Sequence, residues 1–208
     1  MFFPRCTFKQ ILDTILISQV EQNYTYYYNI CGTVTDYPAA CATLPGLGSA
    51  AAIQVNQRAT TDPTDDWCYN VGMYDLHAET VLIDQEDPSK GIMLTYYGDY
   101  CGNHKQRQFH IQLECADKLN PVPTHALELT GCQYTVTIPS VYGCPVECPV
   151  GGAQRKLCGG NGFCAYDTDA STARCFCNAG IIRIMAPYNK TCRFKISVNQ
   201  HNNNHSFC

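Results

Sequence analysis

The fifteen cysteines of this 208-residue chain restrict its fold and its compartment more than any other feature. Cytosolic reductants keep thiols reduced, so this many cysteines are typical of an extracellular, cell-surface or secretory-lumen protein held together by disulfides. Charged residues make up only 15% of the chain, against roughly 25% in an average soluble protein. Because fifteen is an odd number, at least one cysteine lacks a partner within the chain.

Charge and hydropathy argue against two classes of protein. The formal net charge is -4, and no basic stripe is available to displace counterions from the phosphates of a nucleic acid. The longest apolar runs are about ten residues or fewer, short of the roughly 20 that cross a bilayer, so we expect no membrane span in this segment. Residues 1–20 carry Arg5, Lys9 and Asp13 and do not read as a signal peptide. Met1 therefore either starts a fragment or follows a leader that has been removed.

Three sequons for N-glycosylation agree with a secretory compartment. They begin at Asn23, Asn189 and Asn204 and have the pattern Asn-x-Thr or Asn-x-Ser. Such sites accept glycans on the surface of secreted proteins. They indicate a compartment and leave the activity open.

The apolar pattern predicts a short helix followed by an antiparallel all-β domain. Apolar residues from Phe8 to Leu16 recur with the spacing of an amphipathic helix. Segments rich in Tyr, Thr, Val and Ile follow, with turn residues between them. The predicted strands are Tyr24 to Val34, Ala51 to Val55, Thr80 to Ile83, Ile92 to Tyr97, Phe109 to Leu113 and Tyr134 to Ile138.

Alternation places charged and polar residues on core-facing rows. In the segment from Arg107 to Cys115 the apolar residues share the odd positions with Arg107. A later row contains Tyr134 and, extended backwards at period two, Glu128. An unpaired charge in such a row is costly, so Arg107 should reach a carboxylate or open onto a polar pocket. A structural ion pair between Arg107 and Glu128 is the alternative.

From Cys148 onward the chain is dense in Cys and Gly and has little apolar periodicity, so disulfides must hold it. Its six cysteines, the Cys-x-Cys pair at Cys175 and the glycines between them resemble an EGF-like module. The resemblance implies the disulfides Cys148–Cys164, Cys158–Cys175 and Cys177–Cys192. The calcium-binding variant of this family has an acidic cluster before its first cysteine. Here only Glu147 stands there, so we predict no bound calcium.

The longer first part resembles the mannose-6-phosphate receptor homology (MRH) domain, the P-type lectin fold. The motifs that carry the resemblance are YYYNICG, AAAIQ, GIMLTYYGDYC, R-x7-C, E-x3-C-x-Y and the closing YGCP, in this order. They imply a flattened antiparallel β-barrel or sandwich. We predict a lectin-like domain at 6–145, an EGF-like module at 146–193 and a linker toward a further module at 194–208.

Members of this family bind mannose through a glutamine, an arginine, a glutamate and a tyrosine. Matched motif by motif, these residues are Gln54, Arg107, Glu128 and Tyr134. Vicinal sugar hydroxyls both donate and accept, which suits this set of side chains. Phosphate-binding members have a longer loop before the cysteine that matches Cys101, so we expect recognition of mannose without phosphate.

The resemblance also implies the remaining disulfides, Cys6–Cys31, Cys101–Cys132 and Cys115–Cys144. Position 53, where the family often has a cysteine, is Ile53, and Cys68 appears further along the chain. We therefore hypothesise a Cys41–Cys68 bond. This assignment leaves Cys208 without a partner.

Two function classes follow. In the first, the chain is a non-catalytic, carbohydrate-binding module that recognises terminal mannose on N-glycans. In the second, it is a structural or assembly module of a larger extracellular or filamentous glycoprotein, and its own glycans could serve as ligands for a neighbouring copy. We expect no enzyme, because no nucleophile, phosphate-loop or zinc motif is present, and no cofactor or metal. The tail from His201 to His205 has metal-like spacing but reads as a linker.

Overall fold

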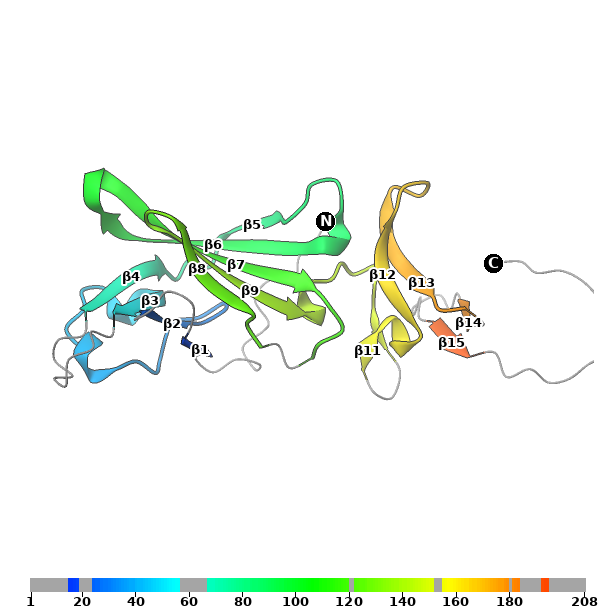
Figure 1. The fold of residues 1–208 in the computed structure, drawn as a ribbon, viewed down its shortest axis with the longest axis horizontal. Coiled ribbons are helices and arrows are strands. Elements are labelled where there is room, and N and C mark those ends of the chain that lie inside the picture. The colour runs from blue at the N-terminus through cyan, green and yellow to red at the C-terminus, as the bar shows by residue number, and fades with distance from the viewer. Residues whose placement is uncertain are drawn as a thin grey trace, which may run out of the picture. The chain divides into compact units, whose positions relative to one another are not determined.

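The computed structural model describes residues 15–18, 24–56, 67–119, 122–151, 155–179, 181–183 and 192–194. This part of the chain consists of β-strands joined by turns and short 3-10 helices, without an α-helix (Figure 1). The predicted all-β, disulfide-rich class is confirmed. The chain divides into two compact units. The first is Met1–Val81, Met93–Gln112 and Pro123–Ile138, and the second is Leu82–Ile92, Leu113–Val122 and Pro139–Cys208.

A four-stranded antiparallel sheet lies within the first unit. Its order is β1-β2-β3-β4, and its strands are β1 (Ile15–Ser18), β2 (Tyr24–Tyr28), β3 (Ala50–Asn56) and β4 (Trp67–Met73). The predicted N-terminal helix is wrong at Ile15 and Leu16, which pair with Tyr28 and Tyr27 of β2. Pairing with β2 supplies the backbone hydrogen bonds that a helix would otherwise provide, and β-branched Ile15 suits a strand. Residues 8–14 lie outside the described part.

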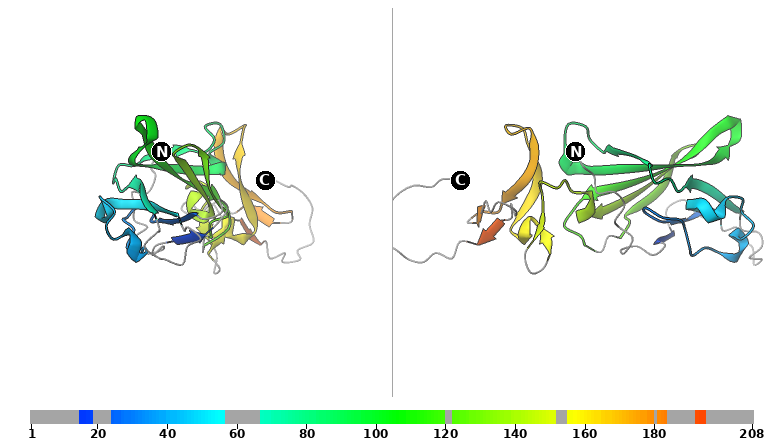
Figure 2. Two further views of the ribbon diagram at one scale, coloured as in Figure 1. Left: turned by 60° about the vertical axis from the view of Figure 1, so that its left-hand side comes forward. Right: turned by 180° about the vertical axis from the view of Figure 1, so that it is seen from behind.

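A second sheet has five strands in the order β5-β6-β7-β9-β8. They are β5 (Glu79–Leu82), β6 (Gly91–Cys101), β7 (Lys105–Cys115), β9 (Gln133–Ser140) and β8 (His125–Thr130). Strands β6 and β7 are joined by a short 3-10 turn and run beside one another along their length (Figure 2). The order ends at β5 and β8, so within the described residues this sheet is open, and the predicted barrel or sandwich does not take the form of a closed barrel.

Aromatic side chains from both sheets meet in the core of the first unit. Tyr26 and Tyr28 of β2 have ring centroids 6.2 and 5.6 Å from that of Phe109 on β7. Tyr26 also lies 5.9 Å from the ring of Tyr134 on β9. These separations are in the range of favourable aromatic pairs. All four rings are buried, so the two sheets are held together here by tyrosine and phenylalanine.

The hairpin of β8 and β9 differs from the single strand that alternation predicts. The sequence predicts one continuous row from Glu128 to Ile138, but the chain reverses at Gly131 and Cys132, where Cys132 has a φ of 72°. Glu128 and Tyr134 then lie directly opposite one another on neighbouring strands. They share a face because paired residues of an antiparallel hairpin do so, and not because one strand runs through both.

The second unit contains three small antiparallel pairs. They are β10 (Val150–Gly151) with β11 (Lys156–Leu157), β12 (Gly162–Asp167) with β13 (Thr172–Cys177), and β14 (Ile181–Arg183) with β15 (Cys192–Phe194). Its buried cluster consists of Val141, Leu157, Ala173 and the cysteines 148, 158 and 175. A core this small does not stabilise a fold alone, which explains why cysteines take half of its positions.

Five disulfides lie within the described residues, and each joins a predicted pair. They are Cys41–Cys68, Cys101–Cys132, Cys115–Cys144, Cys148–Cys164 and Cys158–Cys175. Disulfides in this number indicate the secretory pathway or the extracellular space.

Several predictions concern residues outside the described part. Cys31 and Cys177 are also disulfide-bonded, but their predicted partners are Cys6 and the side chain of Cys192, which the structure does not describe. The asparagines of the three sequons and Cys208 lie outside it as well. Among the described residues, no helix has the length and apolar character required to span a membrane.

Candidate functional site

The four side chains singled out by the sequence come from four strands of the first unit. Gln54 lies on β3, Arg107 on β7, Glu128 on β8 and Tyr134 on β9. Both sheets therefore contribute to the site. Hydrogen bonds and ring contacts connect three of the four, and the fourth is the cross-strand neighbour of Tyr134.

Arg107 is the centre of the site. Its guanidinium donates a hydrogen bond to the hydroxyl of Tyr134. The guanidinium carbon lies 5.9 Å from the centroid of the Tyr134 ring and 4.6 Å from that of Tyr69 on β4. Both distances are within the range of cation–π contacts. The side chain is half-buried, and two tyrosines hold the orientation of its guanidinium.

Gln54 is linked to Tyr134 through a third tyrosine. The Gln54 amide nitrogen donates to the hydroxyl of Tyr26 over 3.1 Å, and these two residues are opposite one another on β3 and β2. The ring of Tyr26 in turn packs on that of Tyr134. Gln54 is only 2% exposed and Tyr134 only 1%, so both lie beneath the surface of the site.

Glu128 is anchored to the turn of its own hairpin. One carboxylate oxygen accepts a hydrogen bond from the backbone N–H of Cys132 at 2.6 Å, and Cys132 is tied to Cys101 by a disulfide. Glu128 and Arg107 are both described, and no ion pair joins them, so the structural ion pair considered as an alternative does not form. The second carboxylate oxygen has no hydrogen-bond partner among the described residues.

The environment keeps the phenol of Tyr134 protonated. Its pKa is raised to about 12, mainly by burial; the charge and hydrogen bond of Arg107 oppose this rise, and the charge of Glu128 adds to it. Burial also raises the pKa of the Asp99 carboxyl on β6, against the lowering effect of the Arg107 charge. At neutral pH the Tyr134 hydroxyl can therefore accept from Arg107 and still donate its own proton.

A pH titration tests this environment. The pKa of Tyr134 is raised from 10.0 to about 12 on folding. The protonated phenol therefore contributes fully to the free energy of unfolding below pH 10, and this contribution is lost as the pH rises toward 12. We expect the free energy of unfolding of the unchanged chain to fall more steeply between pH 10 and 12 than that of Tyr134→Phe. Urea denaturation across this range measures both slopes, and equal slopes would contradict the assigned environment.

Two residues of this cluster have no signal in the sequence that marks them as part of a site. The sequence places Tyr26 in the predicted strand Tyr24 to Val34, and it places Tyr69 in no predicted strand. Tyr26 and Tyr69 both lie opposite Gln54, on the two strands that flank β3. Only the register of those pairings identifies them, and no local pattern specifies a register between segments separated by long loops.

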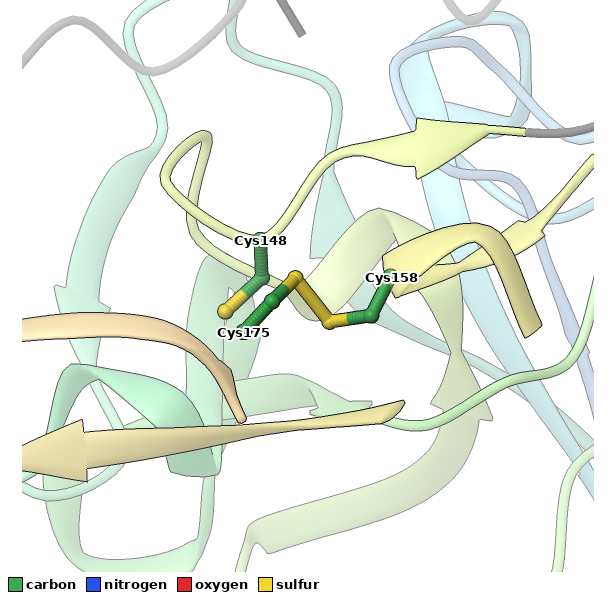
Figure 3. A group of neighbouring side chains, drawn as sticks. All are labelled: Cys148, Cys158 and Cys175. Atoms are coloured by element: carbon green, nitrogen blue, oxygen red, sulfur yellow. A yellow bond between two sulfur atoms is a disulfide. The ribbon is translucent and has the colours of Figure 1, made fainter. Parts of the chain in front are cut away.

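Three buried cysteines of the second unit are the one group in the described part that has the geometry of a metal site. The sulfur atoms of Cys148, Cys158 and Cys175 lie within 4.8 Å of one another. Figure 3 shows Cys158 and Cys175 joined by a disulfide, and Cys148 is bonded to Cys164. Metals bind the thiolate form of cysteine, which these bonds remove. The cluster is therefore two neighbouring disulfides.

A groove of about 790 Å³ lies in the second unit. Its lining includes the carboxylates of Asp84, Asp87 and Glu114 and a single amine, that of Lys90, whose Nζ lies 3.7 Å from Asp87. The groove is therefore acidic, and its lining contains none of the side chains that the sequence singled out.

Comparison with known proteins yields a distant structural likeness. No protein-family model matches the sequence, and no curated protein sequence matches it either. A similar solved structure is the MRH domain of Yos9 in complex with α3,α6-Man5, with 15% sequence identity and a TM-score of 0.39. The match covers 62% of this chain and 74% of that one. A likeness this loose says nothing of what this chain binds.

Proposed function

We propose that this chain is a non-catalytic, MRH-like carbohydrate-binding module that recognises terminal mannose on N-glycans and does not require phosphate. The observation that supports it is the gathering of an amide, a guanidinium, a carboxylate and a phenol, Gln54, Arg107, Glu128 and Tyr134, in one cluster built by four strands. In this proposal, residues 6–145 form the lectin-like domain and residues 146–193 an EGF-like module.

The chemistry of the cluster suits a neutral sugar. Adjacent hydroxyls of a pyranose need donors and acceptors side by side. Arg107 retains N–H groups beyond the one given to Tyr134, and one carboxylate oxygen of Glu128 has no hydrogen-bond partner in the described part of the chain. Hydrogen bonds to charged groups of this kind are stronger than those between neutral partners. Together they would bind two neighbouring hydroxyls, including the axial 2-hydroxyl that distinguishes mannose.

Burial divides the four residues into two roles. Arg107 and Glu128 are half-exposed, whereas Gln54 and Tyr134 are buried. The sugar would meet Arg107 and Glu128 directly, and Tyr134 would fix the guanidinium from below. Gln54 would act through Tyr26, whose ring packs on Tyr134. A preformed arrangement of this kind lowers the entropy cost of binding.

A glycan array tests the proposal with the full chain. We expect binding to high-mannose glycans, inhibition by methyl α-mannoside and not by methyl α-galactoside, and no gain from phosphorylated mannose. The absence of binding to every mannose-terminated glycan would contradict the proposal and favour the assembly hypothesis. Equal inhibition by the two glycosides would show that the axial 2-hydroxyl is not read.

A further inference from the structure

We propose that Tyr69 is a positioning residue of this site, and that the Cys41–Cys68 disulfide holds its ring against Arg107. The inference rests on the proposed function for its effect on binding. The geometry that carries it is independent of any ligand. The proposal gives a role to β4, a strand that carries none of Gln54, Arg107, Glu128 and Tyr134.

Tyr69 is in direct contact with the guanidinium of Arg107. The guanidinium carbon of Arg107 lies 4.6 Å from the centroid of the Tyr69 ring, closer than it lies to the Tyr134 ring at 5.9 Å. A planar guanidinium stacks on an aromatic face and keeps its N–H groups free around its edge. Tyr69 therefore restrains the plane of the guanidinium, while the hydrogen bond to Tyr134 restrains its rotation within that plane.

Tyr69 lies near the start of β4. It lies opposite Gln54, while Cys68 lies opposite Val55 and Trp67 opposite Asn56. Tyr69 is thus the third residue of β4. Ten residues, 57–66, separate the two strands. An anchor near the first residues of β4 would add to the backbone hydrogen bonds that pair them with β3.

The anchor is the disulfide beside Tyr69. Cys68 is bonded to Cys41, which ends the 3-10 helix η1 (Ala39–Cys41) and is completely buried. Cys41 belongs to an apolar cluster with Val34, Leu47, Ile53 and Val55. The bond therefore connects the start of β4 to a buried part of the first unit. Successive residues of a strand point to opposite faces, so Cys68 is held on one face while Tyr69 reaches Arg107 on the other.

The test compares the glycan affinity of four variants of the full chain by titration calorimetry. Tyr69→Ala is expected to weaken mannose binding about tenfold, as expected for a partly desolvated cation–π contact. Tyr69→Phe retains the ring and should bind within about twofold of the unchanged chain. Removal of the disulfide by Cys41→Ser with Cys68→Ser should weaken binding to the same degree as Tyr69→Ala. Adding Tyr69→Ala to that pair should cause little further loss, because both changes remove one interaction.

A matched disulfide provides the control for stability. Cys115–Cys144 lies in the second unit, so Cys115→Ser with Cys144→Ser should lower the unfolding temperature and leave mannose affinity within about twofold. Tyr69→Ala binding as tightly as the unchanged chain would overturn the proposal. Unchanged mannose affinity after loss of Cys41–Cys68 would show that the disulfide does not hold the Tyr69 ring against Arg107.

A ligand-free measurement separates this inference from the proposed function. A ring at 4.6 Å from the guanidinium shifts the NMR resonances of the Arg107 Cδ protons. In Tyr69→Ala and in the variant without Cys41–Cys68 the shift should fall to the smaller part contributed by the more distant Tyr134 ring, and it should persist in full in Tyr69→Phe. If the chain binds no mannose but these shifts behave as expected, the proposed function fails and the positioning role stands. Unchanged shifts in Tyr69→Ala would refute the positioning role whatever the chain binds.

Discussion

Arg107→Ala is expected to weaken the binding of a mannose-terminated glycan about 100-fold or more. The guanidinium provides the charged donors of the site, and each hydrogen bond to a charged group contributes about 1.5–3 kcal/mol, so the loss of two corresponds to at least this factor. Arg107→Lys keeps the charge but loses the planar fork and the stacking on Tyr69. We expect the lysine variant to bind nearly as weakly as the alanine variant.

Calorimetry with a soluble high-mannose glycan measures these affinities, and Arg174→Ala is the matched control. Arg174 also contacts an aromatic ring, that of Phe176 at 5.0 Å, and pairs with Asp167, but it lies in the second unit. Its removal should leave glycan affinity unchanged. Equal effects of the two alanine substitutions, or retained binding by Arg107→Ala, would contradict the assigned site.

Gly98→Ala is expected to lower the free energy of unfolding of the first unit by about 3 kcal/mol or more, at or above the upper end of the usual cost of overpacking. A β-carbon on Gly98 would lie 2.4 Å from the carbonyl carbon of Val71 and 2.5 Å from the carbonyl oxygen of Asn70. Both atoms belong to the backbone of β4, which cannot rotate away as a side chain can. Relief of the clash requires β6 and β4 to move apart, and β4 carries Tyr69.

Gly102→Ala is the matched control for this prediction. Gly102 follows the same strand, and a β-carbon there would meet nothing within 4 Å. We expect its effect to stay within about 0.5 kcal/mol, as for an ordinary surface substitution. Urea denaturation under non-reducing conditions, followed by near-ultraviolet circular dichroism, compares the two variants. Similar unfolding midpoints would show that the sheets accommodate the added methyl group.

Local patterns predicted the long strands well. The odd positions of β7 were expected to face inward, and Phe109, Ile111 and Leu113 are indeed buried. This succeeds because the pleat of a strand imposes a period of two on any half-buried segment. The sequence patterns do not predict β4 and β8 as strands of their own. Strand β4 contains Asn70 and Gly72, residue types depleted in strands, and it exists because β3 pairs with it.

Alternation and the family resemblance predict different residues of the site. Alternation placed Arg107 and Tyr134 on inward rows, and both lie in the cluster. Glu128 was placed by extending one strand too far, although the hairpin brings it opposite Tyr134 all the same. Gln54 came only from the resemblance to a lectin family. A polar residue in a strand has no local signature that separates a binding role from packing.

By itself, the sequence determined that this chain is a β-rich protein stabilised by disulfides, because cysteine number and two-residue alternation are local properties. Only the tertiary structure decided that Tyr69 contacts Arg107 and that Tyr26 packs on Tyr134. Tyr26, Tyr69 and Tyr134 come from three strands in two sheets. Their meeting depends on the register of strand pairs and on how closely the sheets approach. Both are set by contacts between residues far apart in the chain, and therefore by the packing of the whole unit.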